Sequence, residues 1–150
     1  MTSTRATRTC ATASISVASS STDMASRDEI VAIPDRYIAA VAAGDVDTIM
    51  SLYNDNPRVE DPIGEPAHEG VDAVRAFYTQ LRDSGFKISL TRITPVCVAG
   101  GNEAAFAFRV DVDLGEMTMS MVTHDTMVFD EDGRISQMRA YADSQATPES

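Results

Sequence analysis

The chain has 150 residues, of which 43% are hydrophobic and 23% charged, and this length and composition fit one globular domain. Its 23 acidic and 12 basic residues give a net charge of −11, which excludes nucleic acid and anionic membrane as expected partners because both need clustered positive charge. The sequence has no apolar run of the roughly 20 residues that a membrane span needs, and its two histidines and two cysteines give no zinc-ligand spacing.

The first 26 residues differ in composition from the rest of the chain. Residues 1–26 are rich in Ser, Thr and Ala and contain no Phe, Tyr or Leu, so we expect a disordered tail. Arg5 and Arg8 without neighbouring acids resemble a transit peptide, whereas Met24 as the true initiator is the alternative interpretation. We expect the folded domain over residues 27–145 and a short second tail over 146–150. Because Cys10 lies in the first tail and Cys97 in an apolar run, we expect no disulfide and a cytoplasmic location.

Two helices are predicted at the start of the domain. Apolar residues recur at helical spacing between Asp28 and Ala43, although Pro34 means that the helix either begins beside it or kinks there. Gly44 is a typical helix end, and Asp45 is a typical N-cap for a second helix. The apolar face of that second helix is predicted to carry Val46, Ile49, Met50 and Tyr53, with Asn54–Pro57 ending it.

The pattern changes from helices to strands along the rest of the domain. A short strand at Arg58–Asp61 is followed by a third helix between Gly70 and Gly85. Beyond it apolar residues alternate with polar ones, which is typical of strands. The predicted strand regions are Phe86–Val98, Glu103–Leu114, Met117–Phe129 and Arg134–Ala142. Helices followed by an antiparallel meander predict an α+β fold, in which a curved antiparallel sheet packs against three N-terminal helices and leaves a pocket between them.

Asp125 interrupts an apolar strand face. Alternation along the strand places it on the same side as Met117, Met119, Met121 and Met127. An ionised, unpaired carboxylate is costly to bury, so we expect a protonated or tightly hydrogen-bonded group with a raised pKa. A neutral carboxylic acid can donate a hydrogen bond to an oxyanion. Alternatively, Asp125 pairs with an arginine or caps a bulge near the strand end. The methionine face by itself is typical of a hydrophobic core.

Asp61 and a group of three tyrosines are further candidates for a functional site. Asp61 ends a strand directly before Pro62, so its side chain can point into a cavity mouth, although a simple turn is the commoner role of an Asp-Pro pair. Its neighbour Glu60 is predicted to face solvent on the other side. The inward stripes of the three helices each carry one tyrosine: Tyr37, Tyr53 and Tyr78. Their hydroxyls can form one hydrogen-bonded chain if they converge. Alternatively, each tyrosine packs separately in the core.

Several stretches of the sequence together resemble one family: RYIAAVAAGDVDTIMSLY, VEDPIGEP, AFYTQ, NEAAFAFRV and the pair DTMVFDEDGRI and MRAY. Over roughly residues 28–142 the chain is similar to the ketosteroid isomerases, which are steroid Δ5-3-ketoisomerases of the nuclear-transport-factor-2-like, SnoaL-like superfamily. The most specific part is VEDP, with a tyrosine 24 residues earlier and a strand aspartate 64 residues later. The resemblance implies a cone-shaped α+β fold, a homodimer, no cofactor or metal, and a small hydrophobic, steroid-like ketone as substrate.

The resemblance also implies roles for individual residues. Asp61 matches the general base of the family, Tyr37 the oxyanion-hole tyrosine, and Asp125 the protonated aspartate that donates the second hydrogen bond, as is established for these enzymes. Tyr53 and Tyr78 match the phenols that support the first tyrosine. The matched pocket-lining positions are Phe108, Met121, Met138 and Ala140. The implied reaction moves a β,γ double bond of a 3-oxo-Δ5-steroid into conjugation through a dienolate.

Several functions besides isomerisation stay open on the sequence alone. Ala142 stands where some family members carry a bulky aromatic residue, which implies a wider pocket. Polyketide cyclases and epoxide hydrolases share the fold, and the hydrolases need an Asp-Arg-Asp grouping for which no arginine is clearly placed. A non-catalytic carrier of an apolar ligand and a structural dimerisation domain are two further possibilities. His68 is predicted to lie in a solvated loop and His124 on the strand face opposite Asp125, and a hairpin turn is predicted at Asp130–Gly133.

Overall fold

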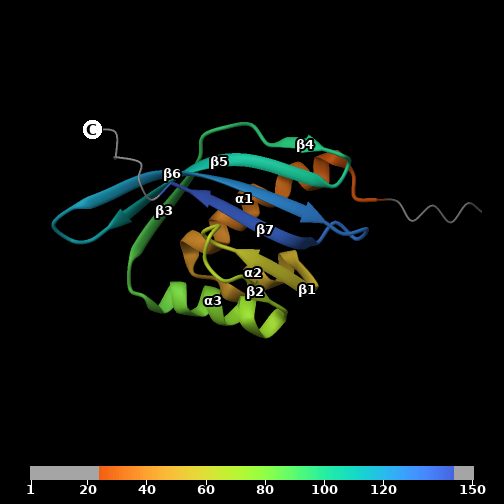
Figure 1. Ribbon diagram of the computed structural model, residues 1–150. Coiled ribbons are helices and arrows are strands. Elements are labelled where there is room, and N and C mark those ends of the chain that lie inside the picture. Colours follow the sequence, from red (N-terminus) through yellow and green to blue (C-terminus); the bar gives the residue numbers. More distant parts are fainter. Residues whose placement is uncertain (1–23, 144–150) are drawn as a thin grey trace, which may run out of the picture.

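The computed structural model of the protein describes residues 24–143 (Figure 1). Residues 1–23, which make up most of the predicted first tail, and residues 144–150 lie outside the described residues. The elements are α1 (Arg27–Ala43), α2 (Val46–Leu52), β1 (Tyr53–Glu60), β2 (His68–Glu69), α3 (Val71–Asp83), β3 (Lys87–Arg92), β4 (Cys97–Ala99), β5 (Glu103–Asp113), β6 (Thr118–Phe129) and β7 (Ile135–Ala142).

Local capping chemistry sets the bounds of the first two helices. Ser26 is the N-cap of α1, and its hydroxyl accepts a hydrogen bond from a backbone N–H of the first turn. Pro34 lies inside α1, so the helix does not begin beside it. Gly44 ends the helix at φ +66°, a left-handed conformation that favours glycine. Asp45 then caps α2 by accepting from the N–H of Thr48 at 3.0 Å. The predicted helix boundary at Gly44 and Asp45 is confirmed.

The prediction that Tyr53 lies on the second helix was wrong. The helix ends at Leu52, and Tyr53 begins β1 in extended conformation. Tyr53 pairs with Ile135 at the start of β7, so a partner more than 80 positions away in the sequence decides the backbone conformation at this point. The side chain is nevertheless buried in the core, because the first residue of the strand still faces the helices.

The sheet has seven strands in the order β2-β1-β7-β6-β5-β3, with β4 paired to β5 beside β3. All of these pairs are antiparallel except β1 and β7, which run parallel. The predicted α+β class with a curved sheet is confirmed, but the sheet is mixed and not purely antiparallel. The physical reason is that β1 and β7 lie far apart along the chain, with α3 and five strands between them, and only a long connection allows a parallel pair.

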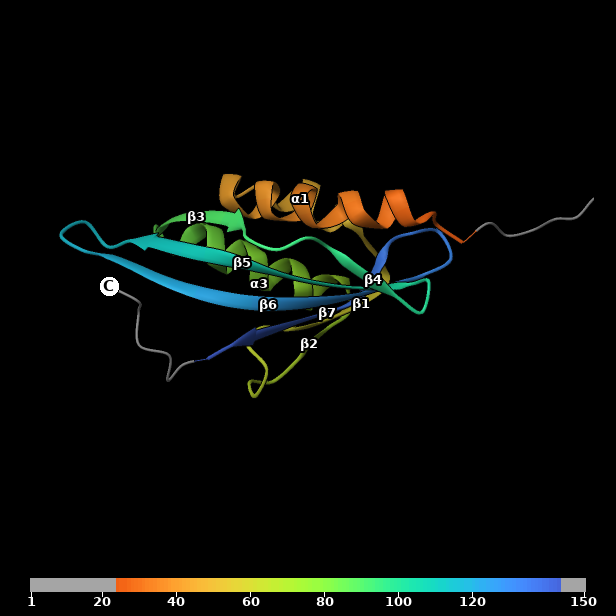
Figure 2. The same ribbon diagram turned by 90° about the horizontal axis from the view of Figure 1, so that it is seen from above.

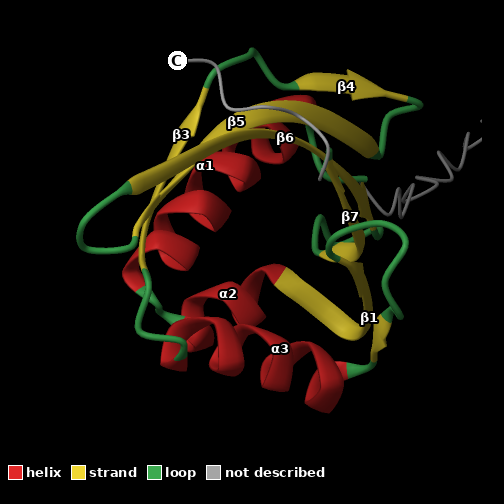
Figure 3. Ribbon diagram, turned by 60° about the vertical axis from the view of Figure 1, so that its left-hand side comes forward, coloured by secondary structure: helices red, strands yellow, loops and turns green. Residues whose placement is uncertain are grey.

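The curved sheet wraps around the helices. Figure 3 shows α1, α2 and α3 inside the arc of the strands, and Figure 2 shows α1 lying along the long strands β5 and β6. The exposed fraction of the methionines falls from 64% at Met117, just before β6, to 39% at Met119 and 0% at Met127 within the strand. The methionine face therefore passes from an open rim into the core, and Asp125 lies toward its buried end. Within the described residues, no helix is both long and apolar enough to cross a membrane.

Candidate active site

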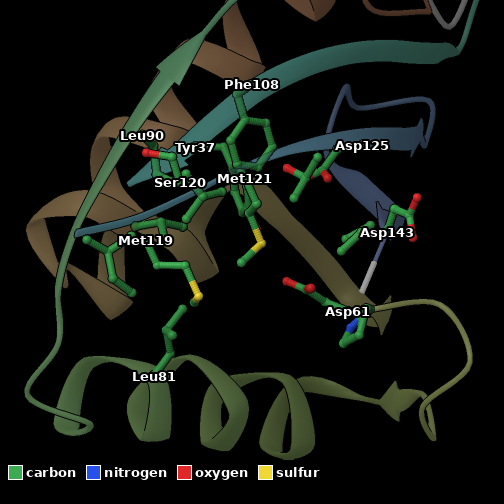
Figure 4. A pocket seen from close by; sticks show the side chains of 17 residues that line it. Tyr37, Asp61, Leu81, Leu90, Phe108, Met119, Ser120, Met121, Asp125 and Asp143 are labelled. Atoms are coloured by element: carbon green, nitrogen blue, oxygen red, sulfur yellow. The ribbon is translucent and has the colours of Figure 1, made fainter. Parts of the chain in front are cut away.

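A cavity of about 490 Å³ lies between the helices and the concave face of the sheet. Its wall is mostly apolar, and it includes Tyr37 from α1, Asp61 from the turn after β1, and Asp125 from β6. Figure 4 shows Asp61 and Met121 entering the same hollow from opposite sides. The structure therefore brings these three polar side chains to one cavity, although they lie up to 88 positions apart in the sequence (37 to 125).

Asp61 is held at the end of β1 by the backbone of its own turn. The N–H of Ile63 donates to the carbonyl of Ala140 on β7 at 2.9 Å, which fastens the turn against the sheet. The Asp61 side chain is half-buried, and its carboxylate points into the hollow (Figure 4). Burial raises the pKa of Asp61 above its ordinary value, and the nearby His68 acts in the opposite direction. A carboxylate with a raised pKa in an apolar cavity is suited to accept a proton.

The neighbouring acid Glu60 lies in the opposite environment. It forms ion pairs with Arg58 at 2.9 Å and Arg139 at 2.7 Å, and these arginines lower its pKa. Its side chain is 17% exposed, so the prediction that it faces solvent was wrong. The reason is that Arg139 lies on β7, directly beside β1. This pairing joins residues far apart in the chain, so the residues next to Glu60 in the sequence did not indicate it. Of these two adjacent acids, only Asp61 lines the cavity.

The three tyrosines converge in one hydrogen-bonded chain. The Tyr37 and Tyr78 hydroxyls lie 3.0 Å apart, and those of Tyr78 and Tyr53 lie 2.7 Å apart. All three rings are buried, and burial raises the pKa of each phenol well above its ordinary value, so each carries its proton at neutral pH. Tyr37 lines the cavity, whereas Tyr53 and Tyr78 lie behind it and do not. The hydroxyl of Tyr37 reaches this chain from a helix that contains Pro34.

Replacing Tyr78 with Phe should weaken the chain at its centre. The variant leaves the hydroxyls of Tyr37 and Tyr53 without their shared partner, and one hydrogen bond of this kind contributes about 1 kcal/mol. We expect the free energy of unfolding to fall by about 1–3 kcal/mol, because two buried hydroxyls lose a partner. Urea unfolding measures this change. Tyr141→Phe is the matched control, since Tyr141 is an exposed tyrosine on β7, and equal losses in both variants would contradict a cooperative chain.

Asp125 is buried without a charged partner. It is 1% exposed, and its Oδ1 has no hydrogen-bond partner among the described residues. Within residues 24–143 no arginine forms an ion pair with it, so the alternative interpretation of a structural arginine pair has no support there. Burial and the charge of Asp61 raise the pKa of Asp125 well above its ordinary value. This environment favours the neutral acid, whose O–H can donate a hydrogen bond.

The remaining predicted pocket residues fall into two groups. Phe108, Met121 and Ala140 line the cavity, whereas Met138 is fully buried and is not among the lining residues. Ala142, the position expected to widen the pocket, also lines the cavity. Further lining residues that were not predicted include Leu81, Leu90, Val110 and Thr123. Alternation along the strands could have predicted two of them, because Val110 lies on the same face as Phe108 and Thr123 on the same face as Asp125.

His68 lies on β2, so the prediction of a solvated loop was wrong. It is half-buried and paired with Val59 of β1, and its ring stacks on Phe77 with the ring centroids 4.6 Å apart. A strand of two residues has no readable sequence pattern, which explains the error. His124 is exposed and lies on the other face of β6 from Asp125, as alternation predicts.

Two other predictions concern residues away from the cavity. Asp130 accepts hydrogen bonds from the backbone N–H groups of Asp132 and Arg134 in the turn between β6 and β7, in agreement with the predicted hairpin. Cys97 is an exposed, free cysteine on β4, and Cys10 lies outside the described residues. Neither feature takes part in the cavity.

Comparison with known proteins identifies the family. The family model of the SnoaL-like domain matches residues 35–138, which is more than half of the chain. The chain belongs to the SnoaL-like family. This SnoaL-like domain is 39% identical over 113 residues to a protein of Nocardioides simplex named steroid Delta-isomerase, and the match covers 75% of this chain and 89% of that protein. The resemblance to the ketosteroid isomerases is confirmed at this level.

A solved structure shares the fold of this SnoaL-like domain. It comes from work on the epoxide hydrolase/cyclase-like enzyme SalBIII in pyran ring formation in the polyether salinomycin. The TM-score is 0.67 at 24% identity, and the match covers 79% of this chain and 91% of that chain. At this identity the likeness shows the fold alone.

Proposed function

We propose that this SnoaL-like protein is a steroid Δ-isomerase, which moves the double bond of a β,γ-unsaturated ketone into conjugation. The observation that carries the proposal is that Asp61 shares one mostly apolar cavity with Tyr37 and Asp125, and burial raises the pKa of both of these groups. The 39% identity to a protein named steroid Delta-isomerase supports it. The proposed substrate is a 3-oxo-Δ5-steroid or a similar hydrophobic ketone.

The reaction needs one base and two hydrogen-bond donors. The Asp61 carboxylate removes a proton from the carbon between the carbonyl and the alkene, and the electron pair of that C–H bond moves through the carbonyl to give a dienolate. Tyr37 and Asp125 donate hydrogen bonds to the dienolate oxygen. Asp61, now protonated, returns the proton to the far end of the former alkene, the carbonyl re-forms, and the double bond is conjugated. The proton and electrons balance without a co-reactant.

The charge of the site explains why neutral donors suit this reaction. Among the described residues that line the cavity there is no Arg, Lys or His. When Asp61 takes the proton its negative charge disappears, and one negative charge appears on the substrate oxygen. The total charge of the cavity therefore stays constant. Neutral O–H donors in a site of low dielectric stabilise that displaced charge without a buried cation, whose desolvation would be costly.

The direct test uses 5-androstene-3,17-dione and follows the ultraviolet absorbance of the conjugated enone that forms. We expect the purified protein to convert it catalytically without an added metal or cofactor. Tight binding of the ketone without conversion would contradict the proposal and favour an apolar-ligand carrier. The absence of arginine from the described cavity lining weighs against the Asp-Arg-Asp site that an epoxide hydrolase of this fold needs. The predicted homodimer stays a prediction.

The rate should depend on pH through Asp61. Because Asp61 must be ionised to act as base, kcat/KM with a neutral ketone should rise with pH through the raised pKa of Asp61 and then level off. His68 lowers the pKa of Asp61, so His68→Gln, which removes that influence, should move the rising limb to higher pH. Steady-state rates over a pH series measure this shift. The matched control is His124→Gln on the opposite face of the sheet, and an equal shift in both variants would contradict the assignment.

A further inference from the structure

Thr123 contributes a second polar atom without a partner to the cavity wall. Its side chain lines the same cavity as Asp125, the residue is 6% exposed, and its Oγ1 has no hydrogen-bond partner among the described residues. A buried hydroxyl that makes no hydrogen bond is unfavourable, and valine has the same shape without that cost. The proposed mechanism assigns no task to this hydroxyl. Its position therefore points to a ligand that supplies the missing partner.

The neighbours of Thr123 in the sheet offer its hydroxyl no hydrogen-bond partner. Thr123 is paired with Phe108 on β5 and with Ala142 on β7, and both of these residues also line the cavity. Directly paired residues of neighbouring strands project to the same face, so these are the side chains that flank Thr123. A phenyl ring and a methyl group offer neither a donor nor an acceptor.

The two-residue spacing along β6 indicates which part of a ligand would meet the Thr123 hydroxyl. Thr123 and Asp125 project from the same face two positions apart, which separates their side chains by about 7 Å. If the reacting carbonyl oxygen lies at Asp125, which rests on the proposed function, Thr123 faces the next part of the ring system. A threonine hydroxyl both donates and accepts, so it suits a hydroxyl or a keto oxygen.

We propose that Thr123 is a specificity-determining residue that binds a second, neutral oxygen function of the substrate, about 7 Å from the reacting carbonyl oxygen. The substrate class is then an uncharged polycyclic ketone that carries a hydroxyl or keto group on its second or third ring or on the angular methyl group between the first two rings. An anionic substituent does not fit, because the described residues that line the cavity include three aspartates, Asp61, Asp125 and Asp143, and no cation.

The test compares ligands that differ by one oxygen. Dissociation constants are measured by calorimetry for 4-androstene-3,17-dione and for its 7α-, 11β- and 19-hydroxy derivatives, which are already conjugated and so report binding apart from turnover. We expect the wild-type protein to bind at least one hydroxylated derivative about five- to tenfold more tightly than the parent ketone. Thr123→Val should abolish this preference and leave the affinity for the parent within about twofold. The matched control Thr126→Val, a half-buried threonine on the other face of β6, should keep the preference.

Separate outcomes decide the two proposals. Equal weakening of all ligands by Thr123→Val, or no preference in the wild-type protein, overturns the role of Thr123. Conversion of 5-androstene-3,17-dione is measured on the same preparations. Conversion without a preference that depends on Thr123 overturns this inference and supports the isomerase. A preference that depends on Thr123 without conversion overturns the isomerase and supports the binding role of Thr123.

Discussion

Asp61→Asn should lower kcat for the isomerisation of 5-androstene-3,17-dione by about a hundred- to ten-thousandfold. The amide has nearly the same shape as the carboxylate but cannot accept the proton, so the loss comes from the missing base and not from a change in the cavity. Binding of the conjugated product, which needs no base, should remain close to that of the wild-type protein. The measurement is the rate of enone formation together with the product's dissociation constant.

Glu60→Gln is the matched control for this variant. It removes one carboxylate at the adjacent position, but that side chain is paired with Arg58 and Arg139 on the other face of β1. We expect kcat within about threefold of the wild-type value and at most a small loss of stability, because exposed and half-exposed ion pairs contribute about 0–1 kcal/mol. Full activity in Asp61→Asn, or an equal loss in both variants, would contradict the assignment of Asp61 as the base.

Removal of the buried acid Asp125 should slow the reaction and not unfold the protein. The loss of one oxyanion donor typically lowers kcat by about a hundred- to a thousandfold, and we expect this effect for Asp125→Ala. Asp125→Asn keeps an N–H donor at nearly the same position, so its rate should lie between those of the alanine variant and the wild-type protein. Circular dichroism verifies that each variant is folded. Identical rates in the alanine and asparagine variants would contradict hydrogen-bond donation from this position.

The same residue should give a pH-dependent stability difference. Because the pKa of Asp125 is higher in the folded protein than in the unfolded chain, the folded state binds the extra proton. The stability that this proton gives is fully present below the unfolded pKa of about 3.9, and it is lost as pH rises toward the folded pKa. Asp125→Asn should therefore gain stability relative to the wild-type protein as pH rises from about 4. Urea unfolding at several pH values measures this, and a difference that is constant with pH would contradict a buried neutral acid.

Local sequence rules predicted the parts of the fold that depend on neighbouring residues. Gly44 and Asp45 set the boundary between α1 and α2, and the alternation in β6 placed Asp125 on the side of the sheet that faces the cavity. The two aspartates and Tyr37 were named from motif spacing, and the structure places them around one cavity. Their catalytic roles stay a proposal.

The features that the sequence analysis missed depend on pairing between distant segments. Tyr53 is extended because it pairs with Ile135, and Glu60 is ion-paired because Arg139 lies on the adjacent strand. His68 is held by two-residue pairing with β1 and by the ring of Phe77. No window of neighbouring residues contains this information. The parallel contact of β1 with β7 underlies the first two errors, so one topological fact would have corrected both.

The central claim is that one carboxylate, Asp61, carries a proton from one carbon of the substrate to another inside a mostly apolar cavity. Single-turnover conversion of 5-androstene-3,17-dione labelled with deuterium at carbon 4 tests it most directly, with the product analysed by mass spectrometry and NMR. We predict that a substantial fraction of the deuterium that leaves carbon 4 is recovered at carbon 6 of the conjugated product, and that Asp61→Asn forms no such product. Conjugated product of undiminished yield from Asp61→Asn, with the same transfer of deuterium, would contradict the account.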